Sequence, residues 1–130
     1  MLILSIRTDR PEAEIGLYDE GPRIAHETWL AHRELAETIH LKIKDLLESR
    51  QKILGDVDGI AVFQGPGSFT GLRIGISVAN ALADSLGIPI YGSKGDEWTS
   101  KSLVELQSGS DLKTVIPEYG AQPRITKPKR

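Results

Sequence analysis

The sequence predicts an α/β domain of one lobe, with five strands in a mixed sheet and the element order βββαβαβ. Three short runs with strand patterns occupy the first 30 residues. Two longer segments with apolar residues at helical spacing follow, and a short apolar run comes after each of them. With 130 residues, 39% of them hydrophobic, the chain is long enough to bury one core.

Composition argues against several classes of protein. The net charge of -2 gives no overall attraction to nucleic acid or to membrane surfaces. Cysteine is absent, which removes disulfides, thiolate metal ligands and cysteine nucleophiles together. The apolar run at the start is too short for a signal sequence or a membrane span, so we expect a cytoplasmic protein that does not contact the membrane.

The N-terminal part predicts an antiparallel meander. Residues 2–6 form an apolar run that ends at T-D-R-P, where Asp9 and Pro11 favour a turn. Residues 13–18 and 23–30 alternate in polarity on either side of the turn sequence D-E-G-P. Three strands joined by such short turns are expected to pair as neighbours.

The middle of the chain alternates between helix and strand patterns. Apolar residues recur at spacings of three and four over residues 35–47, which predicts an amphipathic helix of about four turns that stops by Gly55. A buried-strand pattern at residues 60–63 precedes a second helix over residues 70–86. Residues 88–92, I-P-I-Y-G, predict the fifth strand.

The order of these elements narrows the fold. Parallel strands joined by helical crossovers close right-handedly, so both crossover helices are expected on one face of the sheet. This arrangement is typical of ribonuclease-H-like and actin-like domains. We assign residues 1–110 to the domain, with a last helix over residues 97–107, and residues 111–130 to an extended tail rich in proline, lysine and arginine.

The glycine-rich turn G-P-G-S-F-T-G at residues 65–71 has two interpretations. It matches neither the P-loop pattern nor the dinucleotide-binding pattern, because both require glycine where this sequence has Thr70. Ser68 and Thr70 are good helix-capping residues, and the free N–H groups of a helix start attract anions. We interpret the turn as a cap and keep a nucleotide phosphate contact by Ser68, Thr70 and Gly71 as the alternative.

The predicted second helix combines small and apolar residues in an unusual way. Gly71, Gly75, Ala79 and Ala83 lie four apart, which lets another helix approach closely along one side. Larger apolar residues cover much of the remaining circumference, which is more than one sheet face can bury. The pattern favours a helix-on-helix interface with another subunit.

The segment G-P-G-S-F-T-G-L-R-I-G-I-S-V-A-N-A-L-A-D-S-L-G-I-P-I-Y-G, with H-R-E-L-A-E-T-I-H-L-K-I-K-D-L-L upstream, resembles the TsaB (YeaZ) family. The resemblance covers residues 2–106 and implies an actin-like fold. It implies a non-catalytic scaffold in the complex that installs threonylcarbamoyl on adenosine 37 of tRNA. It further implies binding to a TsaD-type catalytic subunit through the first two helices, association with the ATPase TsaE, and a homodimer that uses the same face.

Departures from the family pattern bear on the chemistry. The resemblance implies an aspartate that manages magnesium in the first turn, but this sequence has Arg7 there, and a cation cannot ligate a metal ion. Asp9 is near but shifted in spacing. His32, Glu34 and His40 are poorly spaced to share a metal on one helix, so we expect no metal and no cofactor. The second lobe of the relatives is not expected in this chain.

We therefore predict an accessory subunit rather than an enzyme, with no catalytic residue. A nucleotide-binding or ATP-hydrolysing actin-like module is the alternative. Residues 117–130 carry four cations and could contact tRNA phosphates directly. The predicted partner interface comprises Leu35, Phe69, Leu72, Arg73, Gly75, Ile76, Ala79 and Ala83.

Overall fold

The secondary structure follows the predicted order in a computed structural model that describes residues 1–67 and 69–119. The strands are β1 (Leu2–Arg7), β2 (Glu12–Asp19), β3 (Arg23–Leu30), β4 (Gly59–Gly65) and β5 (Ile90–Lys94). The helices are α1 (Leu35–Glu48), α2 (Phe69–Leu86) and α3 (Trp98–Gln107). Short 3₁₀ turns, η1 (His32–Glu34) and η2 (Leu54–Asp56), precede α1 and β4.

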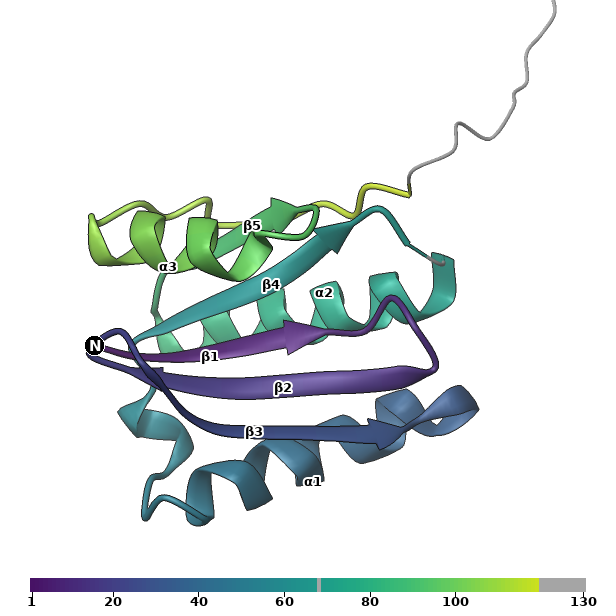
Figure 1. The fold of residues 1–130 in the computed structure, drawn as a ribbon, viewed down its shortest axis with the longest axis horizontal. Helices are drawn as coiled ribbons and strands as arrows, with labels where there is room; N and C mark the ends of the chain where they lie inside the picture. Colours follow the sequence, from purple (N-terminus) through teal and green to yellow (C-terminus); the bar gives the residue numbers. More distant parts are fainter. Residues whose placement is uncertain (68, 120–130) are drawn as a thin grey trace, which may run out of the picture.

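The five strands form one mixed sheet in the order β3-β2-β1-β4-β5. β2 pairs antiparallel with both β1 and β3, whereas β4 pairs parallel with both β1 and β5 (Figure 1). The predicted meander and the predicted mixed sheet are both confirmed.

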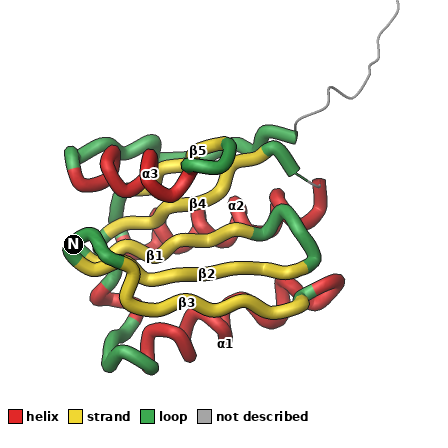
Figure 2. The backbone as a smooth tube through the Cα atoms, viewed as in Figure 1, coloured by secondary structure: helices red, strands yellow, loops and turns green. Residues whose placement is uncertain are grey.

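Helices cover the two faces of the sheet unequally. The crossover helices α1 and α2 lie together on one face, as predicted, and α3 lies on the other face over β4 and β5 (Figures 1 and 2). Phe63 of β4 packs edge-on against Trp98 of α3, with ring centroids 5.8 Å apart. α3 does not extend over β2 and β3, where polar side chains pair across the strands. For example, His26 Nε2 lies 2.7 Å from Glu14 Oε2.

The core lies mainly between the sheet and the pair α1 and α2. Alternate strand residues point into it, and one face of each amphipathic helix closes it. Over both faces of the sheet, the largest fully buried side chains are Ile3, Leu4, Ile6, Ile15, Leu17, Ile39, Leu47, Ile60, Val62, Leu72, Ile90 and Leu106. Within the described part of the chain, none of the helices is both long and apolar enough to cross a bilayer.

Residues 111–119, here called the strap, return along the domain after α3. The side chain of Asn80 on α2 holds the strap at Val115, because its amide donates to the Val115 carbonyl and accepts from the Val115 N–H, both at 2.9 Å. Further along, the N–H of Glu118 donates to the carbonyl of Gln64 on β4 at 2.9 Å. The first nine residues of the predicted tail therefore pack on the domain. Residues 120–130, with the four cations, lie outside the described residues, and the predicted domain boundary stays a prediction.

Asp111 anchors the start of the strap. Its Oδ1 accepts hydrogen bonds from the N–H of Ile90 at 3.1 Å and from the N–H of Lys113 at 2.9 Å. Burial works to raise the pKa of this carboxyl, but the two backbone N–H groups and the Lys113 ammonium outweigh it and hold the pKa below its ordinary value. The carboxylate form therefore stabilises the strap.

Candidate functional site

The glycine-rich turn between β4 and α2 is closely packed by two other segments. A Cβ on Gly65 would meet the carbonyl of Glu118. Gly65 also has a φ of 136°, a backbone angle that residues other than glycine rarely adopt. A Cβ on Gly67 would meet the side chain of Asp9 in the turn after β1. These glycines are required because the strap and the β1–β2 turn both approach the loop backbone.

Charge in the β1–β2 turn is already paired. Arg7 Nε donates to Asp9 Oδ1 at 2.8 Å, and the Arg7 guanidinium lies 4.0 Å from the centre of the Phe63 ring. Only 8% of the Asp9 side chain is exposed. The Asp9 side chain thus fills the space beside Gly67, and its charge is already paired with Arg7.

The structure places only part of the residues named for the alternative phosphate contact, and it also shows where the histidines judged unsuited to share a metal lie. Ser68 lies outside the described residues, and Thr70 is exposed in the first turn of α2. The carbonyl of Gly71 accepts a hydrogen bond from Thr8 Oγ1 at 2.7 Å, which ties α2 to the end of β1. His32 lies in η1 and His40 on α1. The described residues contain no group of three or more side chains suited to hold a metal ion.

The small-residue side of α2 faces the chain's own sheet. A Cβ on Gly75 would meet Thr8 Oγ1 and would lie 2.9 Å from Thr8 Cγ2. Ala79 and Ala83, in the same row, are 0% and 2% exposed. The interpretation of this row as a surface for a partner's helix is therefore corrected, because the small side chains let α2 approach β1.

Most of the predicted interface residues are buried beneath the outer surface of α1 and α2, here called the α1–α2 face. Arg73 is exposed, and nothing is described of the Phe69 side chain. The buried residues of the set are Leu35, Leu72, Gly75, Ile76, Ala79 and Ala83. One flank of α2 instead carries a half-buried apolar row of Ile74, Val78 and Leu82, which is packed against the core. Whether this face binds a partner stays a prediction.

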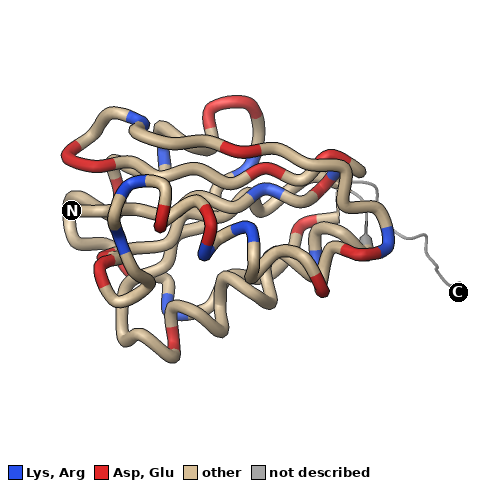
Figure 3. The backbone as a smooth tube through the Cα atoms, turned by 90° about the horizontal axis from the view of Figure 1, so that it is seen from below, with Lys and Arg blue, Asp and Glu red and all other residues tan. Residues whose placement is uncertain are grey.

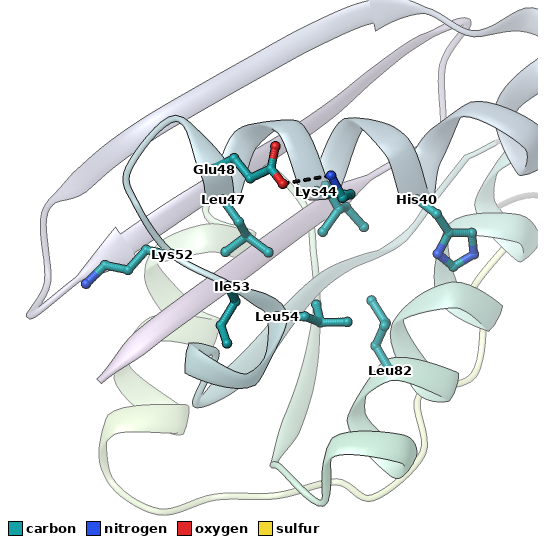
Figure 4. A pocket seen from close by; sticks show the side chains of 9 residues that line it. His40, Lys44, Leu47, Glu48, Lys52, Ile53, Leu54 and Leu82 are labelled. Atoms are coloured by element: carbon teal, nitrogen blue, oxygen red, sulfur yellow. Dashed lines mark hydrogen bonds and ion pairs between the residues drawn. The ribbon is translucent and has the colours of Figure 1, made fainter.

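An apolar groove of about 330 Å³ lies at one end of the α1–α2 face. Leu47 of α1, Leu82 of α2 and the segment around η2 converge on it (Figure 4). Ile53 is 68% exposed and Leu54 is 36% exposed. The full lining is His40, Ile43, Lys44, Leu47, Glu48, Lys52, Ile53, Leu54 and Leu82.

Charged side chains frame this groove along α1. Lys44 Nζ donates to Glu48 Oε2 at 2.7 Å (Figure 4). The hydrogen bond to Glu48, and then the charge of Glu48, raise the pKa of Lys44 above its ordinary value. His40 stands at the other end, on the exposed side of α1. The groove therefore combines an apolar floor with a polar rim, the usual anatomy of a protein–protein contact.

Sequence reasoning missed the groove residues Ile53, Leu54 and Leu82. A usable signal was present, since Ile53 and Leu54 follow the end of α1 and match neither the helical nor the strand period. Two large apolar residues in such a position lack a local element to bury them. Their exposure on the same face as α1 and α2 depends on how the chain turns back into β4.

The described charges show no one-sided basic surface. Positions of lysine and arginine are interspersed with positions of aspartate and glutamate along the backbone (Figure 3). Several of these charged side chains form ion pairs, for example Lys42 with Glu27 at 2.9 Å. A surface of this kind does not by itself attract a polyanion.

A five-stranded sheet in the order 3-2-1-4-5, with its two crossover helices on one face, defines an α/β protein of the ribonuclease-H-like and actin-like class. Residues 29–94, just over half of the chain, match the family model described as TsaD: tRNA N6-adenosine threonylcarbamoyltransferase. The chain belongs to this family, and within it the chain is TsaB/YeaZ-like.

Individual relatives support the family assignment. The chain is 37% identical over 92 residues to the tRNA threonylcarbamoyladenosine biosynthesis protein TsaB of Escherichia coli (strain K12), covering 71% of this chain and 39% of that protein. It is 49% identical over 63 residues to the tRNA N6-adenosine threonylcarbamoyltransferase of Geotalea uraniireducens (strain Rf4), covering 48% of this chain and 18% of that protein.

Solved structures agree with the fold. YeaZ from Pseudomonas aeruginosa matches with a TM-score of 0.66 and 31% identity over 72% of this chain and 43% of that one. The structure of T. thermophilus RuvC with a Holliday junction substrate matches with a TM-score of 0.52 and 14% identity over 72% of this chain and 64% of that one, and it shares the fold alone. The chain thus spans about two fifths of the length of its TsaB and YeaZ relatives.

Proposed function

We propose that this chain is a non-catalytic accessory subunit in the threonylcarbamoyl modification of tRNA, and that it binds a TsaD-type catalytic subunit through the α1–α2 face. Family membership supports the process, because the relatives are named for threonylcarbamoyladenosine biosynthesis or for the transferase itself. A role in tRNA modification implies a cytoplasmic location.

The observation that carries the proposal is the exposed apolar groove between α1, η2 and α2. Ile53 exposes 68% of its surface next to the half-buried row of α2. A contiguous apolar surface framed by polar side chains is typical of an interaction site. Burying one such isoleucine is worth about 1.5–3 kcal/mol.

The β1–β2 turn supports an accessory role over a nucleotide-hydrolysing one. Arg7 and Asp9 neutralise each other, and Asp9 fills the space beside Gly67. The alternative of a nucleotide-binding module requires this turn to open. Isothermal titration of the chain with ATP and magnesium distinguishes the two, since binding that is lost on chelation would favour the alternative.

The interface has a matched test in Ile53→Glu and Leu30→Glu. Both native residues are 68% exposed, but Leu30 ends β3 away from the α1–α2 face. We expect Ile53→Glu to weaken binding to the TsaD-type subunit of the same organism by about tenfold or more, because it places a charge in an apolar contact. Leu30→Glu should bind like the wild type. Equal binding by both variants in a calorimetric titration would refute the proposed face.

Further partners follow from the same proposal and have separate readouts. Sedimentation of the chain alone tests the homodimer, which should dissociate when the catalytic subunit is added because both use one face. Addition of a TsaE-type ATPase to the purified pair tests its recruitment. Removal of residues 120–130 tests the basic tail, and we expect tRNA association of the complex without it to be weaker and to depend less steeply on salt concentration.

A further inference from the structure

The outer edge of the sheet at β5 has a backbone position without a partner. β5 is the last strand of the sheet, so one side of its backbone pairs with no strand. At its start this side is closed, because Ile90 donates to Asp111 Oδ1 at 3.1 Å and accepts from the N–H of Leu112 at 2.9 Å. Gly92 is the next residue on the same side.

The orientation of Gly92 follows from the ladder with β4. The N–H of Ile60 donates to the carbonyl of Pro89 at 3.0 Å, so residues 89 and 91 turn their backbone groups towards β4. Successive residues of a strand turn these groups to opposite sides, which points those of Gly92 outward. Among the described residues none bonds to Gly92 on this side, although Gly92 is buried. A buried N–H and carbonyl without partners carry a free-energy cost that a ligand can relieve.

A groove of about 490 Å³ runs along this edge, between β5 and one side of α3. Tyr91 and Gly92 line its strand side, and Lys101 and Val104 line its helix side. Val104 is 63% exposed, which is high for an apolar residue next to a strand edge. An unpaired strand edge can accept an additional strand from another chain.

The charge of the groove is positive on balance. Lys94 and Lys101 are exposed and make no ion pair with any described residue. The carboxylate in the lining, Glu105, already accepts a hydrogen bond from Ser110 Oγ at 2.7 Å. A ligand with acidic side chains would complement the two free ammonium groups.

The strap limits what shape can enter. Val115 packs against Gly92 from the α2 side, at 3.1 Å between its Cγ2 and a Cβ built on Gly92, and α3 covers the opposite side. Access to Gly92 is therefore along the strand edge. An extended backbone fits such an approach, whereas a helix about 10 Å wide does not reach the Gly92 backbone.

We propose that the β5–α3 groove binds an extended acidic peptide segment of another protein by strand addition. The peptide backbone pairs with the N–H and carbonyl of Gly92, and its acidic side chains lie against Lys94 and Lys101. An apolar side chain of the peptide packs on Val104. This site is separate from the α1–α2 face, so it does not depend on the proposed function.

The probe is an acetylated, amidated hexapeptide that alternates valine with aspartate, titrated into the full ¹⁵N-labelled chain at low salt. We expect a change of the Gly92 amide resonance on binding and at least about tenfold slower hydrogen exchange at that amide. The matched control peptides carry lysine for aspartate or N-methyl groups on the two central residues. Both controls should bind more weakly, because one loses charge complementarity and the other loses main-chain donors.

The matched protein variants are Lys94→Glu with Lys101→Glu, and Lys52→Glu on the other groove. The double variant should bind the aspartate peptide about tenfold more weakly at low salt, whereas Lys52→Glu should bind it like the wild type. No binding of the aspartate peptide, or binding that leaves the Gly92 amide unchanged, overturns the proposal. So does strong protection of that amide in the chain alone, because its donor would then already be paired with this chain or with a second copy.

Discussion

Gly75→Ala tests whether the small-residue row of α2 faces the sheet. The added Cβ would meet Thr8 Oγ1 and lie 2.9 Å from Thr8 Cγ2. Thr8 is 2% exposed, and its hydroxyl donates to the Gly71 carbonyl at 2.7 Å, so it has little freedom to move aside. The substitution therefore overfills a closely packed contact between α2 and the end of β1.

The expected magnitude combines three effects. Overpacking costs about 1–3 kcal/mol, and weakening the Thr8 hydrogen bond costs about 0.5–1.5 kcal/mol. Alanine regains about 1 kcal/mol over glycine inside a helix. The free energy of unfolding of Gly75→Ala should thus fall by about 2 kcal/mol, which corresponds to a drop in Tm of about 5–10 °C for a domain of this size.

The control is the same substitution in a Thr8→Ala background. Without Oγ1 and Cγ2, the closest remaining Thr8 atom is Cβ at 3.0 Å, which a small shift accommodates. Gly75→Ala should there be neutral or stabilising, and chemical denaturation of the four variants should give a coupling of about 2 kcal/mol. If Gly75→Ala instead stabilises the wild-type chain by about 1 kcal/mol, the row does not face the sheet and the reasoning fails.

Three further predictions concern the strap and a buried hydroxyl pair. Asn80→Ala should lower the free energy of unfolding by about 1–3 kcal/mol and speed hydrogen exchange at Val115, because both backbone groups of Val115 lose their partners. Above pH 3.8, the ordinary pKa of an aspartate, the wild-type chain should have a higher free energy of unfolding than Asp111→Asn. The difference should disappear as the pH falls through the lower pKa of Asp111 in the folded chain, which denaturation at a series of acidic pH values would measure. Ser102→Ala should lower the free energy of unfolding by about 1–3 kcal/mol, because it leaves the Ser93 hydroxyl, now 2.8 Å from that of Ser102, buried and unpaired. In chemical denaturation, the variant with alanine at both positions should have a free energy of unfolding closer to that of the wild type.

Local patterns were sufficient for the elements of the fold. The five apolar positions of α1, Leu35, Ile39, Ile43, Leu46 and Leu47, are all buried as their spacing predicted. The alternating runs of the first 30 residues pair as the predicted meander. These predictions succeed because helical and strand periods are properties of neighbouring residues and because short turns leave few ways to pair the strands.

Such patterns could not predict which side of α2 faces the sheet. Its apolar residues surround most of the helix, so the period does not indicate which side faces the sheet. Two rows were available, the small row through Gly75 and the larger row of Ile74, Val78 and Leu82. The contact with Thr8 decides between them, and it joins residues more than 60 positions apart.

The sequence by itself determined the α/β class, the order of the elements, the family resemblance and the mismatch of the glycine turn with nucleotide-binding patterns. Only the tertiary structure decided which side of α2 is outside, that Ile53 and Leu54 form a groove with it, and that the strap docks at Asn80 and Gly65. The reason is physical: local periods act within one element, whereas these contacts join segments that meet only when the chain has closed into its sheet.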